Sequence, residues 1–474
     1  MSALERRLLE LKLRSDLMTF IHRAFHTIAP AQSYQHNWHL EAVAWHLEQC
    51  AKGAIKRLLI TLPPRSLKSI CASVAYPAWV LGHNPTARII CASYSENLAA
   101  KHSLDCRAVM ESDWYRRTFP HTRISREKNT ELNFLTTRQG YRYATSVGGT
   151  LTGRGGNLII IDDPIKPEDA LSEARRSAVN EWFDRTLYSR LDDKRNDTIV
   201  LIMQRLHVED LVGYVTQKEP WVDLRLPAIA EVEQTVALGP DENYMRKVGE
   251  VLHEAREPKE VLDQLKVALG SFNFSAQYQQ CPIPLEGEII HWDWFRFYDE
   301  LPCRVVGDRI VQSWDTASKA EEISDYSVGT TWLMQGNDYY LLDVLRKRLT
   351  YPDLKRQIID HACRFSVNEI IIEDKGSGTA LIQDLGNENI GGVPYPIAFQ
   401  PETDKVTRMH AQSARIEAGH VYLPLRAEWL EDFRTELLQF PKGRYDDQVD
   451  SLSQFLNWVE ERNGGRWWVE PLEL

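Results

Sequence analysis

Long apolar runs, paired cysteines and excess positive charge are all missing from this sequence. No segment approaches the ~18 uninterrupted apolar residues that a transmembrane helix requires. The cysteines number seven, an odd count without a Cys-x-x-Cys pair, which argues against a disulfide framework or a zinc site and for a reducing compartment. The net charge of -11 argues against a protein that coats nucleic acid by bulk charge.

The N-terminus also lacks the apolar core and the small-residue cleavage site of a signal peptide. The segment MSALERRLLELKLRSDLMTFIHRAF instead predicts an amphipathic helix, and we expect a soluble protein without a membrane partner. Positive charge is confined to short patches, each of which is ordinarily a solvated face. An enzyme that holds DNA only briefly needs no more than such patches, which are Arg6-Arg7, Lys56-Arg57, Arg116-Arg117 and Arg346-Lys347-Arg348.

The length and the order of apolar segments predict an α/β protein with two large domains. The chain has 474 residues, and one domain usually takes ~150. The strands RLLITL, ARIICAS, NLIIID and DTIVLIM alternate with helical stretches, which is typical of a parallel sheet covered by helices. We expect an N-terminal helical arm over residues 1–54, a first α/β core over 55–229, a lid and linker without strong strands over 230–304, and a second α/β domain with a C-terminal tail over 305–474.

The segment LLITLPPRSLKS has the form of a strand that enters a phosphate-binding loop. The standard loop is G-x-x-x-x-G-K-[ST], in which lysine reaches the β/γ phosphates and the hydroxyl binds magnesium. Leu62 and Leu67 occupy the glycine positions here, whereas Lys68 and Ser69 match the last two positions. Taken alone, the segment is also compatible with an ordinary strand-to-helix turn.

A second strand supplies two carboxylates about ninety residues later. The strand from Leu158 to Ile161 ends at Asp162 and Asp163, directly before a proline. The first acid is expected to hold magnesium opposite Ser69, and the second to polarise the attacking water. Acids at strand ends also occur in folds without metals, but the order and spacing of the two motifs favour a P-loop NTPase of the RecA/ASCE-like type that binds ATP and Mg²⁺.

The last third of the chain has the element order of an RNase H-like nuclease. The strand RIVQSWDTAS precedes SVGTTWLMQGNDYYLLDVLRKRL, in which Gln-Gly-Asn-Asp joins two strands into an antiparallel hairpin. The helix PDLKRQIIDHACRF, the strand NEIIIED, a Gly-Ser-Gly turn and the final helix DDQVDSLSQFLNWVEE follow.

Carboxylates stand at the ends of these elements. Hydrolysis of a phosphodiester with two metal ions needs three or four of them from different elements. Asp315 follows the first strand, Glu373 ends the fourth, and Asp446 and Asp447 open the last helix. Each alone has an ordinary interpretation as a surface or helix-capping acid. Together they predict catalytic metal ligands for Mg²⁺, with Mn²⁺ as an alternative ion.

The identity of the ligand on the last helix stays open at this stage. Helix periodicity puts Asp446 closest to the apolar edge, with Asp447 and Asp450 turned further away. Asp325 is a candidate for supporting the metal ligands indirectly. Asp374 should point away from Glu373, because neighbouring residues of a strand face opposite sides.

These residues carry a resemblance to the large terminase subunits of tailed bacteriophages. The blocks that match in order, from about residue 30 to 460, are PPRSLKS, CASYSENLAAKHS, VGGTLTGRGGNLIIIDDP, MQRLHVEDL, FSAQYQQCPIPLEGEII, SWDTA, IEDKGSG and YDDQVD. The resemblance implies an ATPase that pumps double-stranded DNA into a procapsid, joined to a nuclease that cuts concatemeric genomes. It further implies a portal protein, a small terminase subunit and a ring of identical subunits as partners, in the cytoplasm of an infected bacterium.

The resemblance also assigns residues to the ATPase. Arg65 takes the loop position where the family carries a basic residue, so the nucleotide-binding loop comprises Arg65, Ser66, Leu67, Lys68 and Ser69. Arg154 is a candidate arginine finger, and its alternative is a loop arginine that bonds nearby carbonyl groups. Gln204-Arg205 and Asp210 match the block that couples hydrolysis to movement. For His207 a structural role is expected, because no second histidine or cysteine stands at metal spacing.

Two other interpretations compete with a packaging motor. A repair helicase fused to a nuclease would need further helicase blocks and paired RecA-like cores, and only one core is visible. A non-catalytic assembly protein with a decayed nucleotide site is disfavoured, because the lysine, the hydroxyl and both acids are present. The C-terminal segment RWWVEPLEL is expected either to dock on the portal or to pack back on the second domain.

Overall fold

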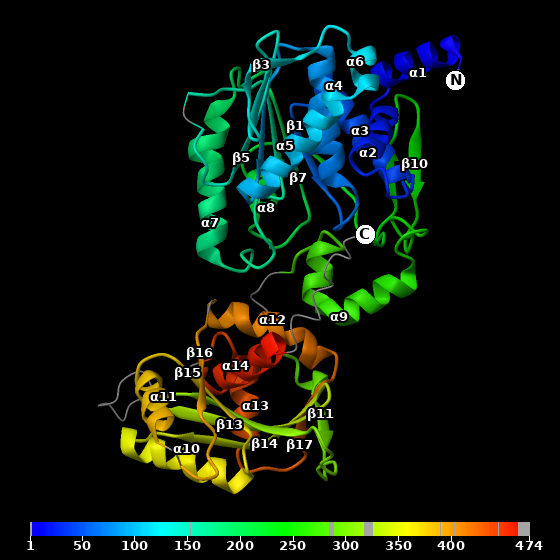
Figure 1. Cartoon of the computed structure of the whole chain (residues 1–474). Helices are drawn as coiled ribbons and strands as arrows, with labels where there is room; N and C mark the ends of the chain where they lie inside the picture. Colours follow the sequence, from blue (N-terminus) through cyan, green and yellow to red (C-terminus); the bar gives the residue numbers. More distant parts are fainter. Residues whose placement is uncertain are drawn as a thin grey trace. The chain divides into compact units, whose positions relative to one another are not determined.

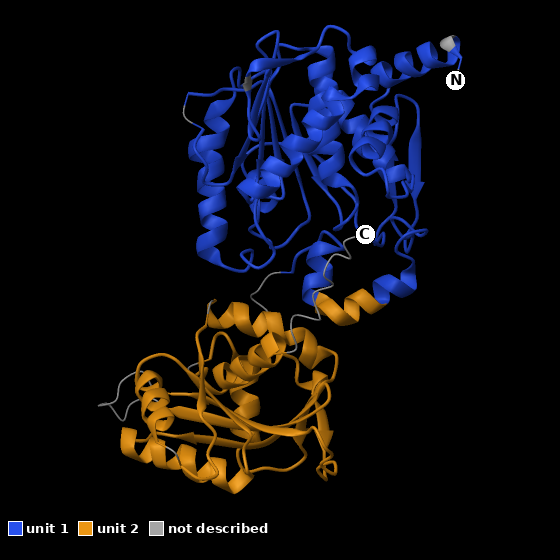
Figure 2. Cartoon of the chain, in the orientation of Figure 1, with its two compact units in different colours: residues 1–263, 272–284 blue, residues 264–271, 285–474 orange. Residues whose placement is uncertain are grey.

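The computed structural model describes residues 2–151, 153–283, 289–316, 326–388, 390–401, 403–443 and 445–462. The chain divides into two compact units (Figure 2). Unit 1 comprises residues 1–263 and 272–284, and unit 2 comprises residues 264–271 and 285–474. Each unit has its own sheet and its own hydrophobic cores.

Unit 1 is built on a large sheet with helices around it (Figure 1). The sheet has eight strands in the order β3-β4-β5-β2-β6-β7-β1-β8. The strands from β5 to β8 in this order pair in parallel, and β3, β4 and β5 pair antiparallel. The strands are β1 (Arg57–Thr61), β2 (Arg88–Ser93), β3 (Ile124–Asn129), β4 (Asn133–Thr136), β5 (Tyr141–Ser146), β6 (Leu158–Asp162), β7 (Thr198–Met203) and β8 (Val222–Arg225). Strands β1, β6 and β7 are buried along their whole length, as expected for the interior of a parallel sheet.

Helices and short turns of helix complete unit 1. They are α1 (Ala3–Ser15), α2 (Leu17–Ile28), α3 (Trp38–Ala51), η1 (Ile70–Ala75), α4 (Tyr76–His83), α5 (Glu96–Glu111), α6 (Asp113–Thr118), α7 (Glu173–Trp182), η2 (Phe183–Leu187), η3 (Tyr188–Arg190) and α8 (Leu211–Thr216). The parallel sheet with helices around it confirms the expected RecA/ASCE-like fold class of the first domain.

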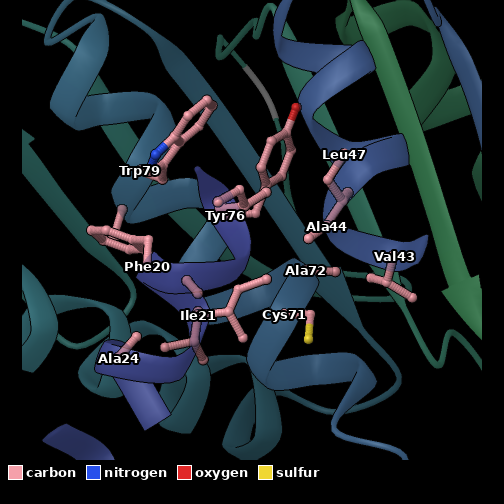
Figure 3. Close-up of a cluster of buried hydrophobic side chains, with 14 of the residues drawn as sticks. Phe20, Ile21, Ala24, Val43, Ala44, Leu47, Cys71, Ala72, Tyr76 and Trp79 are labelled. Carbon is pink, nitrogen blue, oxygen red and sulfur yellow. The ribbon is translucent and has the colours of Figure 1, made fainter. Parts of the chain in front are cut away.

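The N-terminal segment forms two helices instead of the single helix that we expected. Asp16 separates them, because its side chain accepts a hydrogen bond of 3.1 Å from the Thr19 amide and so caps the start of α2. The apolar face of α2 packs with α3, η1 and α4 in the core of unit 1 (Figure 3). Residues 1–54 therefore contribute to that core and are more than a separate arm.

The segment that we expected to be a lid and linker without strong strands contains a small antiparallel sheet. It pairs β9 (Gln234–Ala237) with β10 (Asn243–Arg246). The helix α9 (Lys259–Gln277) follows, and it is interrupted at Gly270, where φ is 74°. A Cβ atom at Gly270 would lie 2.8 Å from the Cβ of Ala414, so this position suits only glycine.

Unit 2 contains a seven-stranded sheet with the order β11-β17-β14-β13-β12-β15-β16. Its strands are β11 (Arg296–Tyr298), β12 (Arg309–Asp315), β13 (Ser327–Gln335), β14 (Asp338–Lys347), β15 (Glu369–Glu373), β16 (Pro396–Phe399) and β17 (Val421–Pro424). Strands β12, β13 and β14 are antiparallel, and β15 pairs in parallel with β12. The expected hairpin is present, with its turn at Gly336, where φ is 62°.

Helices cover both faces of this sheet. One face packs with α12 (Lys405–Glu417), α13 (Leu430–Gln439) and α14 (Asp447–Arg462), and the other with α10 (Tyr351–Phe365) and α11 (Ser377–Asn387). The short η4 (Trp292–Trp294) precedes β11. The expected domain start at residue 305 is too late, because β11 pairs with β17 in this sheet. Within the described ranges, none of the helices combines the length and the apolar character needed to cross a bilayer.

Candidate active sites

The loop after β1 has the backbone of a phosphate-binding loop without its glycines. The φ angles of Arg65 and Leu67 are 61° and 58°, in the left-handed region that residues other than glycine rarely adopt. Leu67 stands at the second glycine position and keeps the conformation that glycine would favour. Such backbone costs about 1–3 kcal/mol per residue and is concentrated at functional sites. Leu62, at the first glycine position, is fully buried in the core.

The lysine and the hydroxyl of the loop both reach the acids at the end of β6. Lys68 Nζ lies 3.0 Å from Asp163 Oδ2, and Ser69 Oγ donates a hydrogen bond of 3.1 Å to Asp162 Oδ1. Ser73, one turn further along η1, donates to Asp162 Oδ2 at 2.7 Å. Ser73 was not predicted from the sequence, although its spacing of four residues from Ser69 puts both hydroxyls on one helix face.

Asp162 lies at the centre of a buried polar cluster. It is fully buried, and burial raises the pKa of its carboxyl, although the hydrogen bond from Ser73 and the charge of Lys68 oppose the rise. His102 Nδ1 lies 3.5 Å from Asp162 Oδ2. Burial lowers the pKa of His102 to about 4, so the ring is neutral at pH 7. Arg142, also fully buried, donates a hydrogen bond of 2.9 Å to the Ser73 carbonyl oxygen and adds positive charge behind this cluster.

Asp163 connects the lysine to the next strand of the sheet. Its φ of 44° turns the chain away from β6. The Gln204 amide, directly after β7, donates a hydrogen bond of 3.2 Å to Asp163 Oδ1. Burial and the neighbouring Asp162 raise the pKa of Asp163, and Lys68 opposes this rise. A water placed between Asp163 and a bound phosphate would therefore meet a carboxylate with raised basicity.

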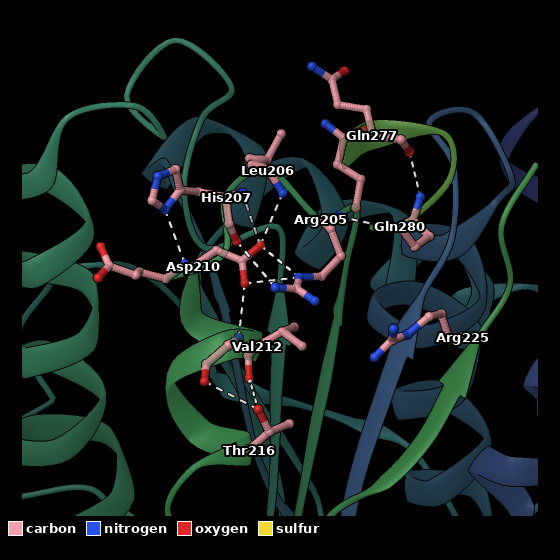
Figure 4. A network of polar contacts seen from close by, with 12 residues as sticks. Arg205, Leu206, His207, Asp210, Val212, Thr216, Arg225, Gln277 and Gln280 are labelled. Atoms are coloured by element: carbon pink, nitrogen blue, oxygen red, sulfur yellow. Dashed lines mark hydrogen bonds and ion pairs between the residues drawn. The ribbon is translucent and has the colours of Figure 1, made fainter. Parts of the chain in front are cut away.

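The residues after Gln204 form a buried network (Figure 4). Arg205 Nε donates to both carboxylate oxygens of Asp210, at 3.0 and 2.9 Å, and the Arg205 amide donates to Gln280 Oε1 at 2.9 Å. Asp210 also caps α8 by accepting from the Gly213 amide at 3.0 Å. His207 accepts a hydrogen bond of 3.1 Å from the Glu209 amide, as a structural histidine would. The network joins the end of β7 to the chain after α9.

Two predicted arginines lie apart from this cluster. The Arg154 guanidinium stacks over the Tyr143 ring, with 4.1 Å from Cζ to the ring centroid. Arg65 is exposed, and its carbonyl oxygen accepts a hydrogen bond from Arg256. Among the described residues, neither guanidinium contacts Lys68 or the acids. The functions of Arg154 and Arg65 stay predictions.

The described residues fit a magnesium nucleotide. Ser69 and Asp162 present hard oxygen ligands of the kind that Mg²⁺ prefers, and Lys68 supplies the cation for the phosphates. Ser66 is almost buried in the loop, with 9% of its surface exposed. The sheet brings these groups together because β1, β7 and β6 are adjacent and parallel, so their carboxyl ends share one edge.

In unit 2, two of the predicted carboxylates lie at the ends of adjacent parallel strands. Asp315 ends β12 and Glu373 ends β15, and the residues before them, Trp314 and Ile372, are paired. The Gly-Ser-Gly turn lets α11 begin against Glu373, because a Cβ at Gly378 would overlap the Glu373 carbonyl oxygen. Asp374 points elsewhere, as expected: it accepts from Thr379 Oγ1 at 2.7 Å.

The acids near the start of α14 differ from the helix phase that we expected. Asp450 is 4% exposed, whereas the Asp446 side chain is 40% exposed and precedes the helix. The prediction that Asp446 lies closest to the apolar edge of this helix is wrong, because Asp446 precedes α14 and the buried acid is Asp450. Burial together with Glu436 and Asp446 raises the pKa of Asp447 to about 6.

These acids influence each other and attract two cations of α12. Burial raises the pKa of Asp315 well above its usual range, and the charges of Asp450, Glu373 and Asp447 raise it further. Lys405 Nζ lies 2.9 Å from Asp446 Oδ1 and also contacts Asp450. Arg408 Nη2 donates to Asp450 Oδ1 at 2.9 Å.

Within the ranges that the structure describes, no three histidine, cysteine or acidic side chains are placed to hold a metal ion together. The donor set still fits Mg²⁺ or Mn²⁺, because it consists of hard carboxylate oxygens whose mutual repulsion a divalent cation would relieve. Lys405 and Arg408 were not predicted, because the sequence around them carries no motif. Asp325 and the C-terminal segment RWWVEPLEL lie outside the described residues.

Comparisons with known proteins agree with this architecture. Residues 312–458 match the family described as the terminase RNase H-like domain. A large terminase structure from a thermophilic bacteriophage is similar, with a TM-score of 0.54 and 11% identity over 90% of this chain and 99% of that one. The complex of that terminase with ADP has a TM-score of 0.52 and 13% identity, over 89% of this chain and 98% of that one. Its complex with ATP-γ-S has a TM-score of 0.50 and 12% identity, over 89% of this chain and 98% of that one. The sequence matches none of the curated proteins with which it was compared. Residues 312–458 of the second unit thus match the terminase RNase H-like domain, and the chain as a whole has the fold of the large terminase structures.

Proposed function

We propose that this protein is the ATPase and nuclease subunit of a viral DNA-packaging motor. It would drive double-stranded DNA into a procapsid at the expense of ATP and cut concatemeric genomes into packaged lengths. The observation that carries the proposal is the pairing of two sites on one chain. One is the phosphate-loop lysine beside two strand-end acids in a parallel sheet, and the other is the acid cluster of a terminase RNase H-like domain.

The ATPase half assigns one role to each residue around the loop. Lys68 would leave Asp163 and neutralise the β/γ phosphates, while residues 65–69 would surround them through backbone N–H groups. Ser69 and Asp162 would hold a Mg²⁺ ion, which would help to neutralise the charge of the phosphates. Asp163 would then orient and deprotonate the attacking water, and Arg154 would add positive charge to the γ-phosphate in the transition state.

Gln204 supports coupling of hydrolysis to motion. Its amide is bonded to Asp163, and the next residue, Arg205, is bonded to Asp210 and Gln280. A change at the γ-phosphate that moves Asp163 would therefore reach the end of α9 through a few hydrogen bonds. Because Arg205 is buried and hydrogen-bonded to the buried Asp210 and Gln280, a shift of one of these residues would displace the others.

The nuclease half would use the carboxylates of unit 2. Asp315, Glu373 and Asp447 would bind divalent ions, with Asp450 or Asp446 completing the set. When bound, such ions supply a nucleophilic hydroxide and stabilise the charge that develops on the phosphate. The raised pKa of Asp315 supports this assignment, because a buried group of carboxylates favours a cation among them. Mg²⁺ is the expected ion, and Mn²⁺ can occupy the same oxygen ligands.

The partners follow from the proposed motor. They are double-stranded DNA, the portal of the procapsid, a small terminase subunit and further copies of this chain in a ring, all in the cytoplasm of the infected bacterium. A repair helicase with paired RecA-like cores is disfavoured, because the described residues contain one parallel sheet of this type.

The test separates the two activities. Asp315→Ala removes a carboxylate of the nuclease site and leaves Lys68, Asp162 and Asp163 unchanged. We expect nicking of plasmid DNA with Mg²⁺ or Mn²⁺ to fall by roughly 10² or more, while ATP hydrolysis and packaging of linear DNA into portal-bearing procapsids persist. Plasmid nicking at the wild-type rate by purified Asp315→Ala protein would refute the nuclease assignment. Absence of packaging by the wild-type protein with its cognate procapsid would refute the motor.

A further inference from the structure

A row of paired residues runs across the sheet of unit 2 from the acid cluster to a basic segment. Asp315 of β12 pairs with Val328 of β13, and Val328 pairs with Arg346 of β14. Directly paired residues of antiparallel strands point to the same face, so Arg346 shares the face of Asp315. Two strand spacings separate them, which is roughly 10 Å. Arg346 is also among the charges that act on Asp447.

Two arginines and two tyrosines form a compact group at this place, which we call the arginine-tyrosine cluster. Arg346 Cζ lies 4.1 Å from the ring centroid of Tyr326 and 4.8 Å from that of Tyr445. Arg348 Cζ lies 4.5 Å from the Tyr326 centroid, and the two rings meet edge to face at 5.5 Å. Arg346 Nη2 lies 3.4 Å from Glu436 Oε2, which fixes the guanidinium on its inner side.

The two arginines differ in exposure. The Arg346 side chain is only 18% exposed, and its Nε and Nη2 atoms are buried. Arg348 is exposed and forms no hydrogen bond or ion pair with any other described residue. The inner arginine therefore anchors the two rings, and the outer arginine keeps its N–H donors for a ligand.

We propose that the arginine-tyrosine cluster binds the phosphodiester backbone of the DNA strand that is being cut. Arg348 donates to a phosphate oxygen next to the scissile bond, and Arg346 with Tyr326 and Tyr445 holds Arg348 in position. The inference rests on the proposed nuclease function and adds the side chains that keep its substrate in place.

The charge of the acid cluster provides the physical reason. Asp315, Glu373, Asp447 and Asp450 repel a polyanion, and bound metal ions offset that repulsion only at the scissile phosphate. Adjacent phosphates need their own cations. A guanidinium stacked on an aromatic ring suits this role, because it is always charged and loses little side-chain freedom on binding.

The neighbouring lysine provides a matched control. Lys347 lies between the two arginines but points to the opposite face of the sheet, because successive strand residues alternate. Its partner in β13 is Ser327, and its charge acts on His361 of α10, which covers that opposite face. Substitution of Lys347 by glutamine removes the same charge from nearly the same point of the chain without touching the cluster.

The experiment compares Arg348→Gln and Lys347→Gln in the full-length protein. Binding to a blunt fluorescent DNA duplex is measured with Ca²⁺ in place of Mg²⁺, over a series of salt concentrations. We expect Arg348→Gln to weaken binding roughly fivefold and to reduce the slope of log K on log salt by about 0.9, as for one lost phosphate contact. Lys347→Gln should leave both quantities unchanged. ATP hydrolysis of both variants should equal that of the wild type.

Two further variants test the role of the rings. Tyr326→Phe keeps the ring and should bind DNA as the wild type does, whereas Tyr326→Ala should weaken binding about as much as Arg348→Gln. A ring needed only for folding would instead lower the unfolding temperature of Tyr326→Ala without changing the salt slope.

The outcomes separate this inference from the function on which it rests. If the wild-type protein neither binds nor cuts DNA, the proposed nuclease function fails. If the wild-type protein cuts DNA and the Arg348→Gln and Lys347→Gln variants bind it equally well, only the arginine-tyrosine cluster is refuted as a DNA contact.

Discussion

The ion pair between Lys68 and Asp163 allows a quantitative test of the proposed nucleotide site. The two side chains are 8% and 20% exposed, and their charged atoms are 3.0 Å apart. Lys68→Met keeps most of the aliphatic length and removes the charge. Asp163 would then lie buried beside Asp162 without its cation, and a buried charge that loses its partner costs about 3–5 kcal/mol.

The expected cost lies at the lower end of that range. Burial and Asp162 already raise the pKa of Asp163, so part of the penalty disappears when this carboxyl takes up a proton. We expect Lys68→Met to lower the free energy of unfolding of unit 1 by about 3 kcal/mol. The double variant Lys68→Met/Asp163→Asn should recover most of this loss, because it removes both charges. In a double-mutant cycle of these variants, the coupling free energy between Lys68 and Asp163 should therefore be about 2 kcal/mol or more.

The assay is a double-mutant cycle measured by urea unfolding. The transition of unit 1 is the one that shifts to higher urea when Mg·ADP is added, because a ligand stabilises the state that binds it. In parallel, ATP hydrolysis by Lys68→Met should fall by at least ~10², since the lysine supplies charge stabilisation in the transition state. If the stability losses of the two single variants add up to that of the double variant within about 0.5 kcal/mol, the ion pair is refuted. If Lys68→Met hydrolyses ATP within a few-fold of the wild-type rate, the proposed nucleotide site is refuted.

Two further predictions concern the acids of α14 and a buried histidine. Asp450→Asn should reduce Mn²⁺-dependent DNA cleavage roughly 10²-fold and Asp446→Asn only a few-fold, because Asp450 is buried beside Asp315; equal losses in a nicking assay would contradict this order. Burial and the nearby His253 lower the pKa of His39 from 6.5 to about 3. As the pH falls, His39 therefore takes up a proton in the unfolded chain before it does so in the folded protein. The stability that the neutral His39 provides is fully present above pH 6.5 and is lost progressively below that pH. Between pH 7 and pH 5 this group lowers the free energy of unfolding by about 2 kcal/mol. The fall in unfolding free energy over this pH range should be smaller by that amount in His39→Gln than in the wild type, and an identical pH dependence of the two proteins would contradict the prediction.

The elements that the sequence predicts well are those with strong apolar patterns. Strands β1, β2, β6 and β7 of the first sheet are largely apolar runs, and the hairpin of unit 2 has clear turn residues at its centre. The hairpin of β9 and β10 was missed because QTVA and NYMR are short and mostly polar, and only one residue of each strand is buried. The break at Asp16 was missed because a capping aspartate between two leucine-rich segments also fits one continuous amphipathic helix.

Whether a residue of the candidate sites can be predicted from the sequence depends on the element that positions it. Residues at the ends of parallel strands, such as Asp162 and Glu373, can be placed from sequence because those ends meet at one edge of the sheet. Residues whose position depends on how a helix is rotated against the sheet cannot be placed from the sequence, and Asp450 is one of them. Lys405 and Arg408 lie about forty residues before the acids they contact, on a helix that has no motif. Only the packing of α12 against α14 brings them together.

The two sites share one electrostatic arrangement, although they lie in different units. In each, a lysine from another element contacts an acid that burial would otherwise favour in its neutral form: Lys68 contacts Asp163, and Lys405 contacts Asp450. In unit 2 a metal ion that binds to Asp450 would compete with Lys405 for the same oxygen atoms. In unit 1 the proposed magnesium ligands are Ser69 and Asp162, and Lys68 would leave Asp163 for the phosphate oxygens of a bound nucleotide. In unit 2 the phosphates of bound DNA would be the corresponding partners of Lys405. By this argument metal ions and DNA should bind cooperatively at the nuclease site, since each supplies what the other displaces.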